Sequence, residues 1–433
     1  MVDKNLFLYD LAVVSIMKDE DPYVKEWIEY HLLAGVDHFY IYDNDSTPKF
    51  KKILQPYIDA DIVTYIHYPG KARQYEAYND AIDKFKFFCR YMTFIDADEF
   101  IFPKSKPTIA EIADEVLMGQ PGAAALGAHW HIFGSNHNKK VDYSKGVLER
   151  FTRRAPNDWY LPPKPPENRF HQGNVYVKSI LNPRLVHYFD DSHLANYFFG
   201  CFTIDERRKI LPMSISFPVV TDKIVVNHYQ VKSLEEYQLR QPRGDVNKKN
   251  SEKYNVNFFK DSDRNEEFDD GILKYRESRI VSLMPFGGLE GVIKSKKIHY
   301  PRLFNALAQN LIPLFVRQLS PNVFFARMEN FLTCYKLNDY LKENFLNEKA
   351  AVFEENALEA VYQSLKLKFH PGDFLMLLNE LPKILTLPYS VVNDIREACI
   401  KIIPQIMEFY QANNYWRGFT ELKYILKMLK TKE

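Results

Sequence analysis

Two aspartates separated by one residue, Asp96 and Asp98, are the side chains of this sequence with the clearest chemical potential. They end an apolar and aromatic run that begins at Tyr91, and Glu99 follows them. Such a run is typical of a buried strand, and acids at its carboxyl end face a ligand crevice in open α/β sheets. On an extended backbone both aspartates point the same way, so together they could hold Mg²⁺ or Mn²⁺ and, through it, a diphosphate. The alternative is an acidic turn or a helix cap.

The elements that must position these acids alternate along the first hundred residues. Apolar runs predict strands at 11–16, 36–42 and 61–68 before the acidic strand, and apolar residues at helical spacing predict helices between them. This alternation indicates a Rossmann-like parallel sheet. Because the carboxyl ends of parallel strands meet at one edge, we expect Glu20 and Asp43 to line the same crevice as the two aspartates.

The rest of the chain predicts a second, different region. Further strands are expected at 123–132, 175–180 and 223–229, and the proline-rich segment 156–166 is expected to be an extended lid. Beyond residue 300 almost every segment has helical spacing. We therefore expect a catalytic domain at 1–290 and an α-helical domain at 291–433.

Composition excludes several classes of protein. Lysine and arginine total 57 and aspartate and glutamate 56, so no charge excess predicts a nucleic-acid partner. The four cysteines are far apart, which favours a reducing compartment, and we see neither a leader peptide nor a run of roughly 20 apolar residues. These features predict a cytoplasmic protein. Glycine-rich phosphate loops are absent, so a bound diphosphate needs another counter-charge, such as a metal.

Several blocks of sequence resemble glycosyltransferase family 92 and its relatives. The similarity runs in order through roughly residues 8 to 280 and is carried by these segments: 11–20, 26–31, 35–44, 74–80, 94–100, 130–135, 149–151, 178–183, 227–233 and 243–244. The resemblance implies a GT-A fold, a nucleotide-sugar donor, a divalent metal that is usually Mn²⁺, and transfer with inversion. UDP-galactose is a recurrent donor in the family, and UDP-glucose is the other donor we favour.

The resemblance also implies roles for individual residues. Asp98, Asp96 and His228 are expected to bind the metal, with Asp98 counted among the catalytic residues. The residues expected around the nucleotide-sugar are Val14, Ser15, Glu20, Asp43, Gln74, Asn79, Asp96, Lys178, Lys232 and Arg243. For Asp43 the alternative is a plain Asx turn, for Gln74 and Asn79 it is helix capping, and for the three cations it is solvation. His31, on an apolar helix face, is expected to be structural.

An inverting transfer also needs a general base for the acceptor hydroxyl. Glu149 is the leading prediction for this base, and Asp142, Asp158 and Glu167 stay open. The alternative for Glu149 is a salt bridge with Arg150 or Arg153.

The predicted function is therefore a metal-dependent glycosyltransferase that moves a sugar to a glycan or glycolipid in surface polysaccharide synthesis. The alternatives are a nucleotidyl- or phosphotransferase on a similar sheet and a non-catalytic binding module. The apolar faces of the C-terminal helices allow a homo-oligomer or a peripheral membrane contact.

Overall fold

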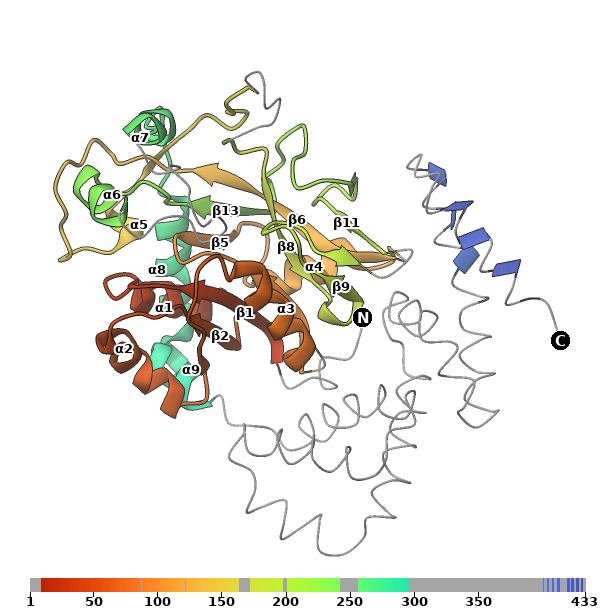
Figure 1. Ribbon diagram of the computed structural model, residues 1–433, viewed down its shortest axis with the longest axis horizontal. Helices are drawn as coiled ribbons and strands as arrows, with labels where there is room; N and C mark the ends of the chain where they lie inside the picture. The colour runs from red at the N-terminus through yellow and green to blue at the C-terminus, as the bar shows by residue number, and fades with distance from the viewer. Residues whose placement is uncertain are drawn as a thin grey trace, which may run out of the picture.

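The computed structural model describes residues 9–86, 88–120, 122–162, 172–197, 201–241 and 256–295, with separate helical positions between 400 and 430 (Figure 1). The described strands are β1 (Tyr9–Met17), β2 (His38–Asp43), β3 (Val63–His67), β4 (Cys89–Phe94), β5 (Glu99–Pro103), β6 (Ala123–Ile132), β7 (Arg153–Arg154), β8 (Val177–Leu181), β9 (Val186–Tyr188), β10 (Asn196–Tyr197), β11 (Phe202–Ile204), β12 (Ile210–Leu211), β13 (Ile224–His228) and β14 (Glu267–Phe268). The described α-helices are α1 (Val24–Leu33), α2 (Pro48–Asp59), α3 (Gln74–Phe85), α4 (Ile109–Leu117), α5 (Val147–Arg150), α6 (Leu234–Arg240), α7 (Val256–Ser262), α8 (Gly271–Leu283) and α9 (Gly288–Ser295).

One mixed sheet organises the described part of the chain. Its main path runs β12-β11-β6-β8-β4-β1-β2-β3, and β13 joins it beside β6 and carries β5. Strands β4, β1, β2 and β3 are parallel, whereas β8 is antiparallel to both of its neighbours. β13 is parallel to β6 and antiparallel to β5. The predicted α/β class is confirmed by this topology, in which four adjacent strands are parallel.

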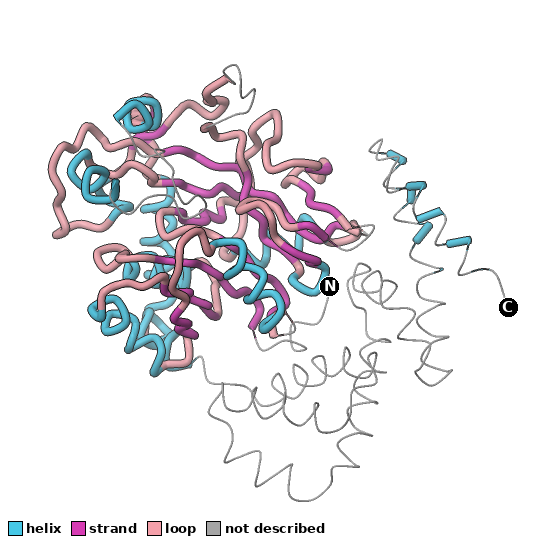
Figure 2. The backbone as a smooth tube through the Cα atoms, in the orientation of Figure 1, coloured by secondary structure: helices cyan, strands magenta, loops and turns pink. Residues whose placement is uncertain are grey.

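Different helices cover the two faces of the parallel strands (Figure 2). Leu11 and Val13 of β1 pack into a core with α1, α2 and α4, whereas Ala12 and Val14 pack into a second core with α3. Successive residues of a strand point to opposite faces, so β1 is buried on both sides. This double burial explains its nearly continuous apolar sequence.

Two helices that the sequence did not predict follow the sheet. Two side chains of α8 attach this helix to the rest of the fold. The Tyr275 hydroxyl donates to the Pro107 carbonyl, just before α4, at 2.7 Å, and Arg279 Nε donates to the Leu33 carbonyl at the end of α1 at 2.9 Å. The predicted domain boundary at residue 290 falls inside α9. The predicted helical domain, with its oligomer and membrane contacts, lies outside the described residues apart from the separate helical positions. Among the described helices, none is both long and apolar enough to cross a bilayer.

His31 is a structural residue of α1, as expected. It is fully buried, its Nδ1 lies 2.8 Å from the Trp27 carbonyl, and its Nε2 accepts from the Ile101 amide of β5 at 3.3 Å. This pairing fixes the neutral tautomer with the proton on Nδ1. Burial, opposed only in part by the bond to Trp27, lowers the pKa of His31 to about 3.

We expect the His31→Phe variant to lose part of the acid sensitivity of the fold. Below about pH 6.5 the unfolded chain binds a proton at His31 that the folded chain excludes, so the wild type loses roughly 1.4 kcal/mol of stability per pH unit at this site. The variant is less stable than the wild type at pH 7.5, because the Ile101 amide loses its acceptor. The difference between their free energies of unfolding narrows toward pH 5. Urea denaturation at both pH values measures this. His67→Gln, at an exposed position of β3, is the control and keeps the wild-type slope. An unchanged gap would contradict the assignment.

Candidate active site

The two aspartates lie in a turn between β4 and β5. β4 ends at Phe94 and β5 begins at Glu99, which reverses the chain rather than extending it. The turn is closed by the Glu99 amide donating to the Asp96 carbonyl at 3.1 Å and by the Asp96 amide donating to the Glu99 carboxylate at 2.8 Å. The expectation of one extended acidic strand is therefore wrong, and Asp96 and Asp98 enter different groups of side chains.

Asp96 belongs to a group formed with α3 and β8. Gln74 Nε2 donates to Asp96 Oδ1 at 2.8 Å, and Lys178 Nζ lies 3.4 Å from Asp96 Oδ2 and 3.2 Å from the Glu99 carboxylate. Lys178 and Glu99 are completely buried. Burial raises the pKa of Glu99 to about 7, against the charge of Lys178. Burial would lower the pKa of Lys178, but Asp96 and Glu99 outweigh it and raise that pKa, so Lys178 is a fixed internal cation.

Asp98 belongs to a second group formed with β13 and α6. Its Oδ2 accepts from Arg240 Nη1 at 2.5 Å, and its Oδ1 lies 3.5 Å from His228 Nε2. The carboxylate is 5% exposed. Burial raises the pKa of Asp98, but the charges of Arg240 and His228 outweigh it and hold that pKa well below its usual range. Lys232, also buried, adds a nearby positive charge that favours the same anion.

Asp98 and His228 fit a divalent metal as an oxygen and a nitrogen donor. They lie side by side, and His228 Nδ1 is buried with no hydrogen-bond partner among the described residues. Asp96 is not grouped with them, since its oxygens face Gln74 and Lys178. Within the described part of the chain, no three His, Cys, Asp or Glu side chains gather as a complete ligand set. The structure thus brings together two of the three predicted ligands.

Aromatic rings line the His228 side of the site. The Trp130 ring lies 4.4 Å from the His228 ring and 4.9 Å from the His193 ring, between centroids, and Tyr176 lies 4.9 Å from His193. Trp130 Nε1 is buried without a partner in the described residues, as is Glu99 Oε1. Buried polar atoms are nearly always paired, so these atoms mark places where a ligand can supply hydrogen bonds. Sequence reasoning gave no role to Glu99, which adjoins the two aspartates, and missed His193, Tyr176 and Arg240, none of which follows a local pattern.

Two residues expected at the nucleotide are already engaged by the fold. Asp43 Oδ1 accepts from the Ser46 amide at 3.0 Å, and its Oδ2 accepts from the Tyr65 hydroxyl at 2.5 Å. The carboxylate thus closes a local turn, as its alternative expected, but the bonded amide is three residues on rather than the two of an Asx turn. Asn79 bonds both backbone groups of Phe189, at 2.9 Å and 2.7 Å, and so joins α3 to the loop after β9.

The structure also describes most of the other residues expected to contact the nucleotide-sugar. The Val14 carbonyl accepts from the Ile95 amide at 3.2 Å, and Ser15 Oγ is buried with no partner among the described atoms. The Glu20 carbonyl accepts from the first amide of α1 at 3.0 Å. Lys232 Nζ lies 4.4 Å from the centre of the Tyr23 ring. Arg243 lies outside the described residues.

Glu149 is held in an ion pair at the surface. Its carboxylate accepts from Arg276 Nη2 at 2.8 Å, and Arg276 also lies 3.6 Å from Glu26 of α1. The Glu26 carboxylate in turn accepts from the Val147 amide at 2.5 Å. Glu149 therefore helps to join α5, α8 and α1, which is the structural alternative to the predicted base, with Arg276 in place of the expected arginines.

A buried ion pair fixes α6, which carries Arg240. Arg150 donates two parallel bonds to the Glu236 carboxylate, at 2.8 Å and 2.9 Å, and Tyr23 donates a third at 2.8 Å. Ser233 and Glu236 also form a capping box at the start of the helix. Bidentate buried pairs of this kind have one geometry, so the first turn of α6 is held rigidly.

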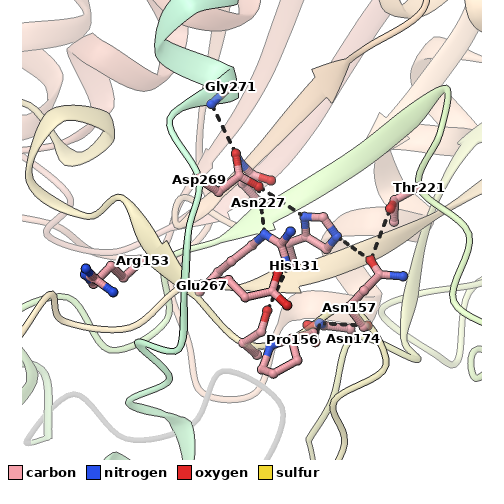
Figure 3. Close-up of polar contacts among 12 residues, drawn as sticks. His131, Arg153, Pro156, Asn157, Asn174, Thr221, Asn227, Glu267, Asp269 and Gly271 are labelled. Atoms are coloured by element: carbon pink, nitrogen blue, oxygen red, sulfur yellow. Dashed lines mark hydrogen bonds and ion pairs between the residues drawn. The ribbon is translucent and has the colours of Figure 1, made fainter.

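A second polar network surrounds His131 of β6 (Figure 3). His131 Nε2 lies 2.9 Å from Asn157 Oδ1, and Arg154 Nε donates to Asp269 Oδ2 at 2.7 Å. The other oxygen of Asp269 accepts from the Gly271 amide at 3.1 Å, where α8 begins. Burial, reinforced by Arg154, lowers the pKa of His131 to about 3. These contacts attach α8 to the sheet, so His131 has a structural role.

Comparison with known proteins places this site in a family. Residues 14–275, more than half of the chain, match glycosyltransferase family 92. A glycosyltransferase family 92 protein of Ricinus communis is 24% identical over 147 residues, 34% of this chain and 26% of that protein. The galactan beta-1,4-galactosyltransferase GALS2 of Arabidopsis thaliana is 28% identical over 100 residues, 21% of this chain and 19% of that protein.

The chain spans well under half the length of these curated relatives. Among solved structures, that of S. aureus TarS 1-349 is 14% identical with a TM-score of 0.29, over 78% of this chain and 92% of that chain. The family match includes the acidic turn and His228. On this match, the chain belongs to glycosyltransferase family 92.

Proposed function

We propose that this protein is a metal-dependent glycosyltransferase that moves a sugar from a UDP-sugar to a hydroxyl of a glycan or glycolipid. The observation that carries the proposal is the Asp98–His228 pair, 3.5 Å apart, within the segment that matches the family. UDP-galactose is the favoured donor, since three similar Arabidopsis proteins are named galactan beta-1,4-galactosyltransferases. UDP-glucose is the second candidate, inversion is the expected outcome, and surface polysaccharide synthesis is the expected pathway.

Asp98 and His228 would hold the Mn²⁺ or Mg²⁺. When bound, such an ion neutralises the charge that grows on a departing diphosphate. The chain supplies the rest of the electrostatics. Lys178 keeps Asp96 oriented, Gln74 donates to the same carboxylate, and Lys232 adds positive charge beside Asp98. Preorganised charges of this kind stabilise a leaving anion because they need no rearrangement during the reaction.

The function is tested with UDP-galactose and UDP-glucose, each with and without Mn²⁺. We expect release of UDP that requires the metal, and titration calorimetry should show UDP binding that also requires it. Release of pyrophosphate would instead indicate a nucleotidyltransferase. Binding of UDP-sugar without any release, across a panel of glycan acceptors, would indicate a binding module. Absence of metal-dependent UDP binding would overturn the proposal.

We expect Glu149→Gln to change turnover by less than about ten-fold. The carboxylate is 43% exposed and paired with Arg276, and loss of a general base costs roughly 10²–10⁴-fold. UDP release at saturating donor measures the effect. Glu290→Gln is the control, because it removes another glutamate that lies on a helix, in this case α9. This variant should release UDP at the wild-type rate. A fall in turnover of about 10³-fold would instead support Glu149 as the general base.

A further inference from the structure

Arg240 occupies the Asp98 oxygen that a bound metal ion would need. Its Nη1 lies 2.5 Å from Asp98 Oδ2, and the same nitrogen donates to the Gln230 carbonyl at 3.3 Å. Asp98 is the main metal ligand in the proposed function, on which this inference rests. A guanidinium and a divalent cation repel each other, so both cannot share one buried carboxylate without loss.

The helix that carries Arg240 lets the side chain move while the backbone stays fixed. Its first turn is anchored by the capping box of Ser233 and by the bonds from Arg150 and Tyr23 to Glu236. Arg240 is the last residue of α6, and its side chain is 28% exposed, against 6% for Arg150. The guanidinium can therefore leave Asp98 by rotation of its own side chain.

We propose that Arg240 neutralises Asp98 in the metal-free protein. When a divalent cation binds Asp98, the Arg240 side chain moves, and its guanidinium pairs with the diphosphate of the nucleotide-sugar instead. In the metal-free state Arg240 is the direct partner of the buried Asp98 anion, at 2.5 Å, with His228 and Lys232 nearby. In the loaded state the diphosphate offers the planar guanidinium two acceptor oxygens in a geometry that suits it. No bond is made or broken in this exchange.

The exchange couples metal binding to nucleotide binding. Without nucleotide, a metal ion must displace Arg240 from Asp98, and the guanidinium loses its ion pair with that carboxylate. With nucleotide, the displaced guanidinium gains the diphosphate, so each ligand strengthens the other. Linkage requires the two enhancements to be equal, so Mn²⁺ strengthens UDP binding by the same factor by which UDP strengthens Mn²⁺ binding. A protein with this arrangement binds the metal weakly until the nucleotide-sugar is also bound.

The test is a titration of Arg240→Met with Mn²⁺ alone, followed by electron paramagnetic resonance of free Mn²⁺. We expect the metal to bind about ten-fold or more tightly than to the wild type, because the competing cation is gone. Turnover should move the opposite way and fall by about 10²-fold, because the leaving diphosphate loses a charge partner. The enhancement of Mn²⁺ binding by UDP should shrink in the same variant.

Two further variants make the test specific. Arg207→Met removes an exposed arginine that pairs with Asp222, so it lowers the net charge equally and should leave Mn²⁺ affinity unchanged. Arg240→Lys keeps a cation near Asp98 and should keep weak Mn²⁺ binding. Equal tightening in the lysine and methionine variants would overturn the proposal, since charge would not be the cause.

The inference and the proposed function fail in different ways. If the wild type shows no metal-dependent UDP binding, the proposed function falls and the exchange falls with it. If the wild type binds UDP with Mn²⁺ but Arg240→Met binds Mn²⁺ alone no more tightly than the wild type, only the exchange is overturned. Both measurements use the full chain and read binding directly, independently of turnover.

Discussion

Replacing Asp98 with asparagine is expected to lower UDP-sugar turnover by about 10³-fold, which corresponds to ~4 kcal/mol of transition-state stabilisation. The carboxylate is 5% exposed and lies between Arg240 and His228. Burial raises the pKa of Asp98, but these two neighbours outweigh it and keep the group ionised at every working pH. Asparagine keeps the size and one acceptor for Arg240 but removes the charge that a divalent cation needs.

The measurement is UDP release at saturating donor and Mn²⁺, with a urea denaturation curve to establish that the variant is folded. Asp222→Asn is the matched control, because it removes a carboxylate that is 74% exposed and pairs with Arg207 at the surface. That control should turn over as the wild type does. Turnover of Asp98→Asn within ten-fold of the wild type would remove Asp98 from the mechanism.

The sheet could be predicted because its signals are local. β1 and β4 are buried on both faces, so their apolar runs stand out from the sequence. His228 was predicted from the family resemblance, which implies a histidine ligand after a strand, and it is the last residue of β13. β13 pairs with β5, and His228 lies opposite Glu99, which is why His228 and Asp98 meet as expected.

The remaining parts of the site depend on contacts between distant residues. Arg240 and Asp98 are 142 positions apart, and Lys178 and Asp96 are 82 apart, with no period or motif linking them. The turn before β5 was only the alternative prediction, because Phe100 and Ile101 resemble a continuation of the apolar run. What bends the chain there is the Glu99 side chain bonding to the Asp96 amide, and no glycine or proline announces it. α8 was missed because Ile272 is its one buried residue, which leaves no clear apolar stripe.

Replacing Lys178 with methionine is expected to destabilise the fold by about 3–5 kcal/mol, which is typical of removing one partner of a buried ion pair. Lys178 is fully buried, lies 3.2 Å from Glu99 and 3.4 Å from Asp96, and donates to the Ser192 carbonyl at 3.1 Å. Methionine fills nearly the same volume, so the loss reports charge rather than a cavity. Urea denaturation at pH 7.5 measures it. Lys274→Met, which removes an exposed lysine paired with Asp270, should leave the midpoint unchanged.

The decisive variant is the double substitution Lys178→Met with Glu99→Gln. If the cost of losing Lys178 is mainly the uncompensated Glu99 carboxylate, removing both charges should restore most of the stability, with a coupling of about 2 kcal/mol or more between the two sites. Activity should not return with it, because Asp96 has lost the cation that orients it and the turn has lost a charged cap on the Asp96 amide. If the double variant instead loses the sum of the stabilities lost in the two single variants, Lys178 and Glu99 act independently. The buried pair would then have no special part in holding the acidic turn.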